Sequence, residues 1–242
     1  MFSLTILLND PGSLAIDDPG KIAILRLMPI RKTILVPGET YHIYNRSVQG
    51  IPIFKGQREN EIFLETIKYY LQANPPTRFS IYRTNKDKFS INHDQKLVTI
   101  INYCLMPNHF HFTLRQEEEN GIRRFIQKIS NSFAHYFALK YQNSGPVFEG
   151  NFKAVRIESN EQLLHLSRYI HLNPVTAYLV ENPEDYPYSS YLIYIRKEKS
   201  EIINPSIVLN QFRYPKQYQK FVLDQKDYQR SLQMIKHLII ER

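Results

Sequence analysis

Residues 97–115 read LVTIINYCLMPNHFHFTLR, and this stretch decides the fold. Its first part is rich in β-branched and aromatic residues, which is typical of a strand. The run ends at Met106-Pro107-Asn108, where Pro and Asn favour a tight reversal. Polar and apolar side chains then alternate over residues 109–115, with Phe110, Phe112 and Leu114 on the apolar face. The pattern predicts two paired strands with one face packed on a core.

The polar face of the second strand carries two histidines. His109 and His111 are separated by one residue, so both imidazoles project to the same side. Two imidazoles at this spacing suit the ligands of one divalent metal ion. The alternative is that they are ordinary half-exposed strand residues without a partner.

A second polar block, RYIHLNPV, occupies residues 168–175. It follows a helix signal, because Ser159 or Asn160 can cap a helix whose first turn holds Glu161 and Gln162. We expect this helix to end at Pro174, since proline disfavours helical continuation.

One stripe of this predicted helix holds His165, Tyr169 and Asn173, which are spaced four residues apart and share a face. A core tyrosine among polar neighbours would explain the pattern structurally. A tyrosine followed one turn later by an amide oxygen that ligates a metal would explain it functionally.

Four motifs in this order carry a resemblance to a known family. They are YHIYNR at 41–46, LMPNHFH at 105–111, FEGNFK at 148–153, and YIHLNPV at 169–175 followed by EDYPYSSY at 184–191. The chain resembles the HUH single-tyrosine transposases, and specifically the REP-associated tyrosine transposase branch, over roughly residues 35–195.

The resemblance implies a metal-dependent transposase that cleaves and rejoins single-stranded DNA at hairpin-associated sites through a 5′-phosphotyrosine. It implies that His109, His111 and Asn173 hold Mg²⁺ or Mn²⁺ and that Tyr169 is the nucleophile. Two alternatives are a catalytically silent protein that binds hairpin DNA and an HUH endonuclease that initiates replication. A nuclease that activates water would use the histidines but would not need Tyr169.

The charge of the chain agrees with a nucleic-acid partner. Lys and Arg number 31 against 23 Asp and Glu, which gives a net charge of +8 and a pI near 9.4. Residues 196–242 are the most basic segment. Candidate contacts to single-stranded or hairpin DNA are Arg46, Arg123, Arg124, Lys128 and Lys153, and His165 is a candidate for supporting the metal site from behind. Ordinary solvated side chains are the alternative for each.

The order of expected elements is strand, helix, strand, strand, helix, strand. They are predicted at 41–46, 59–73, 97–105, 109–115, 121–141 and within 145–157, before the tyrosine helix. This order predicts an α+β, ferredoxin-like split βαβ fold with a central antiparallel sheet, helices on one face, and a C-terminal helical extension. Residues 78–96 resemble an insertion that could form a short hairpin.

The predicted organisation has three parts: an N-terminal extension at 1–27, a catalytic domain at 28–195, and a basic helical extension at 196–242. Translation from Met28 instead of Met1 is a hypothesis. The single cysteine, Cys104, excludes an intrachain disulfide and is expected to be a small core residue. No membrane span is expected. The expected location is cytoplasmic, and both a monomer and a homodimer remain open.

Overall fold

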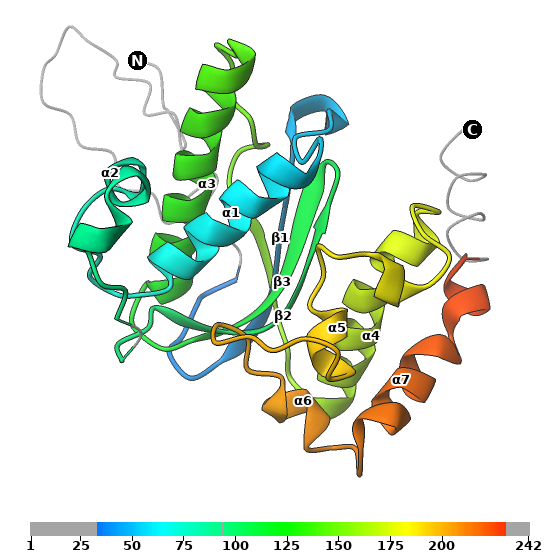
Figure 1. Ribbon diagram of the computed structural model, residues 1–242. Coiled ribbons are helices and arrows are strands. Elements are labelled where there is room, and N and C mark those ends of the chain that lie inside the picture. The colour runs from blue at the N-terminus through cyan, green and yellow to red at the C-terminus, as the bar shows by residue number, and fades with distance from the viewer. Residues whose placement is uncertain (1–32, 93, 231–242) are drawn as a thin grey trace, which may run out of the picture. The chain divides into compact units, whose positions relative to one another are not determined.

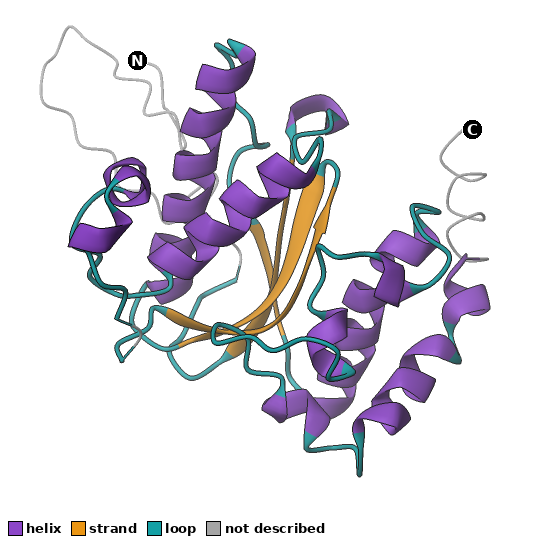
Figure 2. Ribbon diagram, in the orientation of Figure 1, coloured by secondary structure: helices purple, strands orange, loops and turns teal. Residues whose placement is uncertain are grey.

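The computed structural model describes residues 33–92 and 94–230. Within these ranges a single antiparallel sheet contains β1 (Thr40–Arg46), β2 (Val98–Met106), β3 (His109–Gln116) and β4 (Lys153–Arg156). The strands lie in the order β2-β3-β1-β4 (Figures 1 and 2). The helix α1 (Gln57–Tyr70) connects β1 to β2, and α3 (Gly121–Tyr141) connects β3 to β4. This is the ferredoxin-like arrangement, so the predicted fold class is confirmed.

Three predictions concern residues outside the described ranges. They are the extension at 1–27, the alternative start at Met28, and the part of the C-terminal helix beyond residue 230.

The main core lies between the sheet and the two helices α1 and α3, which cover the same face (Figure 1). Phe110, Phe112 and Leu114 of β3 are fully buried there, as their alternation predicted. The apolar residues of α3 that are buried against this core recur at helical spacing: Ile122, Phe125, Ile126, Ile129, Phe133 and Phe137. On α1, Tyr69 is fully buried and Tyr70 is half-buried against the same core.

An extra residue in β2 lets this strand serve two cores. The register with β3 shifts between Ile100 and Asn102, so Ile101 forms a β-bulge. Val98 and Ile100 pack in the core under α1 and α3, whereas Ile101 packs in a second core on the other face. β2 is buried along both faces because the main core covers one face and the second core covers the other.

The second core forms around α4 (Asn160–Thr176), which covers the opposite face of the sheet along β2 (Figure 1). Three short helices pack around α4: α5 (Tyr191–Tyr194), α6 (Ser206–Leu209) and α7 (Pro215–Leu223). Cys104 is buried here with Met106 and Ile170, which agrees with its expected role as a small core residue. The helices of the C-terminal extension therefore support the tyrosine helix directly.

A buried polar network ties α4 to α7 and to the segment before α5. Tyr218 on α7 has its hydroxyl 2.8 Å from Ser167 Oγ and 2.6 Å from His171 Nδ1. His171 Nε2 is 2.8 Å from Ser190 Oγ, and Ser190 Oγ accepts the backbone N–H of Tyr103 on β2. Because these groups are buried and bonded to one another, they fix the position of α4 relative to the sheet.

Residues 79–88 do not form the short hairpin considered from sequence. They form α2 (Phe79–Thr84) and a 3-10 turn, η2 (Lys86–Lys88). A helical turn brings Phe79 and Tyr82 to the same side, and both rings pack on Tyr69, at 5.8 and 4.4 Å between ring centroids. This aromatic packing, which sequence periodicity did not show, favours the helix. Two further 3-10 turns are η1 (Val48–Gly50) and η3 (Pro183–Asp185).

Candidate active site

The two histidines of β3 lie on the sheet face opposite α1 and α3. Since Phe110 between them is fully buried in the main core, His109 and His111 project together to the α4 side. Their ring centroids are 4.9 Å apart, and His111 is only 6% exposed. The structure therefore brings the predicted pair together at the sheet surface.

A hydrogen bond from the turn before β3 fixes the imidazole of His109. Asn108 Oδ1 lies 2.6 Å from His109 Nδ1, and Asn108 Nδ2 donates to the carbonyl of Gly50 at 3.0 Å. Because an amide oxygen can only accept, His109 Nδ1 carries the hydrogen. The lone pair of His109 then sits on Nε2, where a metal ion can bind it.

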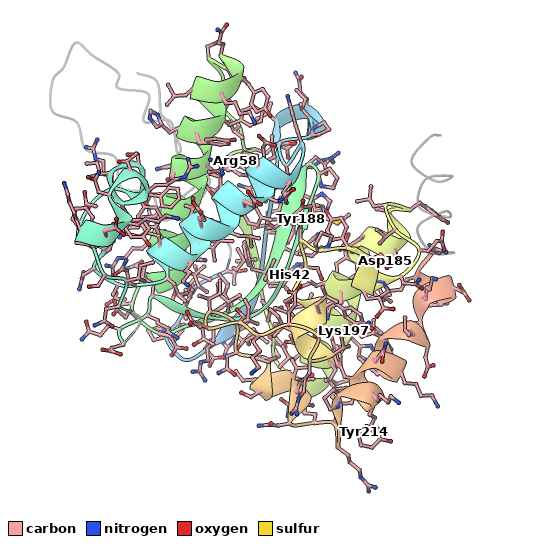
Figure 3. All side chains as sticks on the ribbon, in the orientation of Figure 1. His42, Arg58, Asp185, Tyr188, Lys197 and Tyr214 are labelled. Carbon is pink, nitrogen blue, oxygen red and sulfur yellow. The ribbon has the colours of Figure 1, made fainter. Side chains whose placement is uncertain are left out.

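A third histidine, His42 on β1, completes the cluster. Its Nε2 is 2.9 Å from His111 Nδ1, and the two rings stack with centroids 5.2 Å apart. His42 lies in the middle of the sheet in Figure 3. His42 belongs to the motif at residues 41–46, but the sequence did not predict a role for it. Strand alternation in residues 41–46 could have placed it on the histidine face, but only the sheet register shows that β1 lies beside β3.

All three imidazoles are in an environment that favours their neutral form. Burial lowers the pKa of His42 to about 4, and burial together with the charge of Arg46 lowers the pKa of His109 to about 4. Burial and the neighbouring His109 and His42 hold the pKa of His111 well below its usual value. Neutral imidazole is the form that binds a metal ion.

Tyr169 approaches the histidines from α4. Its ring centroid is 5.7 Å from that of His111 and 6.5 Å from that of His42, and in both cases the rings meet edge-on. The side of α4 next to the sheet buries Leu163 and Ile170. Tyr169 itself is 41% exposed. A phosphodiester arriving from solvent can therefore reach its hydroxyl.

The N-terminus of α4 is as the sequence predicted, and its C-terminus is not. Ser159 caps the helix and accepts from the backbone N–H of Gln162 at 3.1 Å. The helix continues past Pro174 to Thr176, so the expectation that Pro174 ends it was wrong. Burial of Pro174 and Val175 in the second core stabilises this last turn.

Because α4 is continuous through Pro174, Asn173 lies one helical turn after Tyr169. Asn173 is 8% exposed, and its Nδ2 has no hydrogen-bond partner among the described residues. A buried amide N–H without a partner is unusual, and as a donor it lacks an acceptor, which a cation does not supply.

The histidines of β3 offer two neutral nitrogen donors that could hold a divalent cation, and the amide oxygen of Asn173 is a further candidate donor from α4. Within residues 33–92 and 94–230, no group of three or more His, Cys, Asp or Glu side chains, the cluster of His42, His109 and His111 included, is arranged to hold a metal ion. A set of two imidazoles and one amide leaves coordination positions for water or phosphate oxygens.

Two of the predicted DNA contacts lie on the same sheet face. Arg46 is opposite His109 in the strand register, and Lys153 is opposite Tyr44. The ammonium group of Lys153 is 6.0 Å from the centre of the Tyr44 ring, and the Tyr44 ring stacks on His42 at 4.9 Å. Both cations are exposed beside the histidines.

Two comparisons with known proteins give a match. Residues 80–173 match the family model of the IS200-like transposases. The fold also matches a solved structure of a REP-associated tyrosine transposase bound to a REP hairpin, with a TM-score of 0.51 at 14% sequence identity. That match covers 73% of this chain and 94% of the other. A comparison with curated proteins finds no match. The resemblance indicated by the sequence motifs is confirmed.

The segment matched to the transposase family contains the predicted metal ligands and the predicted nucleophile. His109, His111, Tyr169 and Asn173 all fall within residues 80–173. His42 on β1 falls before this segment and α7 falls after it. The family match therefore gives no information on His42, which is the hydrogen-bond partner of His111, or on α7, which packs on α4.

The three basic residues of α3 are not brought to the histidine cluster, because α3 covers the other face of the sheet. Arg124 forms an ion pair with Glu118 and donates to the carbonyl of Ala73. Lys128 lies 5.7 Å from the ring centre of Tyr70, and Arg123 is exposed. DNA contact by these residues stays a prediction and would concern a separate surface.

His165 is not brought to the histidine cluster either. Its side chain is 54% exposed, its Nδ1 accepts from Arg168, and its Nε2 lies 3.8 Å from Glu161. The ideal spacing of four residues placed it on the Tyr169 stripe, but its ring packs toward Phe221.

None of the helices within the described ranges is long and apolar enough to span a bilayer.

Proposed function

We propose that this protein is a transposase that cleaves and rejoins single-stranded DNA beside a hairpin, through a covalent bond between Tyr169 and a 5′ phosphate. His109, His111 and Asn173 would hold a divalent cation, Mg²⁺ or Mn²⁺. The observation that carries the proposal is the placement of an exposed tyrosine with its ring 5.7 Å from His111 of the same chain.

The residues of the site can supply most of what this reaction needs. Tyr169 supplies the attacking oxygen, and the second core holds its helix, α4, in place. Arg46 and Lys153 place positive charge on the same face, where it attracts the negatively charged strand. A bound divalent cation would offset the negative charge of the phosphate oxygens and orient the phosphodiester.

The covalent step conserves atoms and bond energy. The Tyr169 oxygen forms a bond to phosphorus, the bond from phosphorus to the 3′ oxygen breaks, and the phenol loses its proton while the 3′ oxygen gains one. The phosphotyrosine retains the energy of the broken bond. A 3′ hydroxyl can later attack it and rejoin DNA without a nucleotide cofactor.

The choice of hairpin DNA rests on the structural relative, which was solved with a REP hairpin. The exposed strand β4 and the cations Arg46 and Lys153 border the histidine cluster, so a strand leaving a hairpin has a basic surface to follow.

A covalent-adduct assay tests the proposal. The protein is incubated with Mn²⁺ or Mg²⁺ and an end-labelled hairpin oligonucleotide carrying a single-stranded flank, and the mixture is then denatured and resolved by electrophoresis. We expect a shifted protein–DNA band that disappears with EDTA, with Tyr169→Phe and with His109→Ala.

The matched control is Tyr178→Phe, which alters another exposed tyrosine just after α4 and should leave the adduct unchanged. Hairpin binding without any adduct in the unaltered protein would instead support a silent DNA-binding protein. Cleavage that persists in Tyr169→Phe would identify water as the nucleophile and refute the proposal.

A further inference from the structure

The partners of the two metal-site histidines are arranged alike. Each imidazole uses its Nδ1 for a hydrogen bond within the protein: His109 with Asn108 at 2.6 Å and His111 with His42 at 2.9 Å. Asn108 must accept, because its other amide atom donates to Gly50. His109 therefore presents Nε2 to the site.

For His111 to present the same atom, His42 must accept as well. An imidazole holds one hydrogen when neutral, so a hydrogen on Nδ1 leaves the lone pair on Nε2. If His42 donated instead, the hydrogen of His111 would sit on Nε2 and block that atom. Only one direction of this hydrogen bond leaves both β3 histidines with Nε2 free.

We propose that His42 is a positioning residue that accepts the Nδ1 hydrogen of His111 and thereby directs His111 Nε2 to the divalent cation. The inference rests on the proposed metal site. The two ring planes are within 19° of each other with centroids 5.2 Å apart, which suits a hydrogen bond in the plane of both rings, and Tyr44 packs on His42 at 4.9 Å. β1 pairs with β3, and His42 lies opposite Thr113, so it reaches His111 diagonally across the two strands.

Two conservative variants separate this role from simple packing. In His42→Gln the side-chain amide reaches the place of the imidazole Nε2 and can accept from His111. In His42→Asn the amide ends near the place of Nδ1 and falls short. Both variants replace the imidazole ring by a polar side chain that is not aromatic. Loss of ring packing on Tyr44 therefore affects both variants alike.

The first readout is the tautomer of His111 in the metal-free protein, measured by ¹⁵N-edited NMR of the imidazoles. We expect the hydrogen on Nδ1 in the unaltered protein and in His42→Gln, and a shift toward the Nε2 form in His42→Asn. A hydrogen on Nε2 of His111 in the unaltered protein would overturn the inference.

The second readout is Mn²⁺ affinity measured by calorimetry. Loss of such a supporting hydrogen bond commonly lowers metal affinity by about 10- to 100-fold, so we expect this loss in His42→Asn and nearly unchanged affinity in His42→Gln. Equal affinities in all three proteins would overturn the inference while leaving the proposed function intact.

The third readout addresses direct ligation. With ¹¹³Cd²⁺ in place of Mn²⁺, coupling should appear at Nε2 of His109 and His111, and coupling at His42 would overturn the inference by making it a ligand. If the unaltered protein binds no cation, the proposed function loses its metal site, and the tautomer measurement still decides the hydrogen bond.

Discussion

At the scale of single residues, the proposed metal site combines neutral nitrogen donors with one amide. Imidazole nitrogen favours transition metals over Mg²⁺, which prefers oxygen. We therefore expect His109 and His111 to give Mn²⁺ a lower Kd than Mg²⁺, measured by calorimetry at equal ionic strength. His109→Ala should remove most of this binding. Tighter Mg²⁺ than Mn²⁺ binding would show that oxygen ligands dominate the site.

Asn108 offers a second prediction at this scale. Asn108→Leu removes the acceptor for His109 and the donor to Gly50, whereas Asn108→Asp keeps the acceptor. We expect Mn²⁺ affinity to fall by about 10- to 100-fold in the Leu variant and to be largely retained in the Asp variant. Equal loss in both would mean that the bond to Gly50, which shapes the turn, is the important one.

At the scale of elements, local sequence patterns predicted β3, α3 and the start of α4, because each has a clear period or a cap. Ile101 in its bulge, Pro174 inside α4 and the helix at Phe79 depend on packing partners distant in sequence. The role of His42 depends on sheet register in the same way. The pair on β3 and Tyr169 were found from sequence because motif spacing and family resemblance identify them.

The anchoring of α4 gives a prediction about elements. Tyr218→Phe removes the hydroxyl shared by Ser167 and His171 and leaves buried polar atoms unpaired. We expect the free energy of unfolding to fall by about 1–3 kcal/mol, measured by urea denaturation, with reduced adduct formation by Tyr169. Tyr214→Phe, at an exposed tyrosine, is the control and should change stability by less than about 0.5 kcal/mol. Unchanged stability in Tyr218→Phe would mean that the network does not hold α4.

At the scale of the whole molecule, stability should depend on pH through His171. Burial lowers the pKa of His171 to about 3, below the value near 6.5 expected in the unfolded chain. The unfolded state therefore binds the proton more readily, so the contribution is full above about pH 6.5 and is lost as pH falls toward 3, by up to about 1.4 kcal/mol per pH unit. We expect the free energy of unfolding, measured by urea denaturation at several pH values between 7 and 5, to change less steeply with pH in His171→Gln than in the unaltered protein. An identical slope would contradict this assignment.

The molecule also holds Tyr169 beside the histidines of its own chain. A mixture of His109→Ala and Tyr169→Phe proteins should therefore form no adduct, because neither chain has a complete site. An adduct in the mixture would show that the tyrosine helix is exchanged between two copies.

The central claim is that the Tyr169 oxygen becomes bonded to DNA. The most direct measurement is tandem mass spectrometry of the nuclease- and protease-treated adduct formed by the unaltered protein. We predict a nucleotide phosphate on the peptide that contains Tyr169. The same modification on the peptide that contains Tyr44, whose ring lies 5.9 Å from that of His111, would contradict the account.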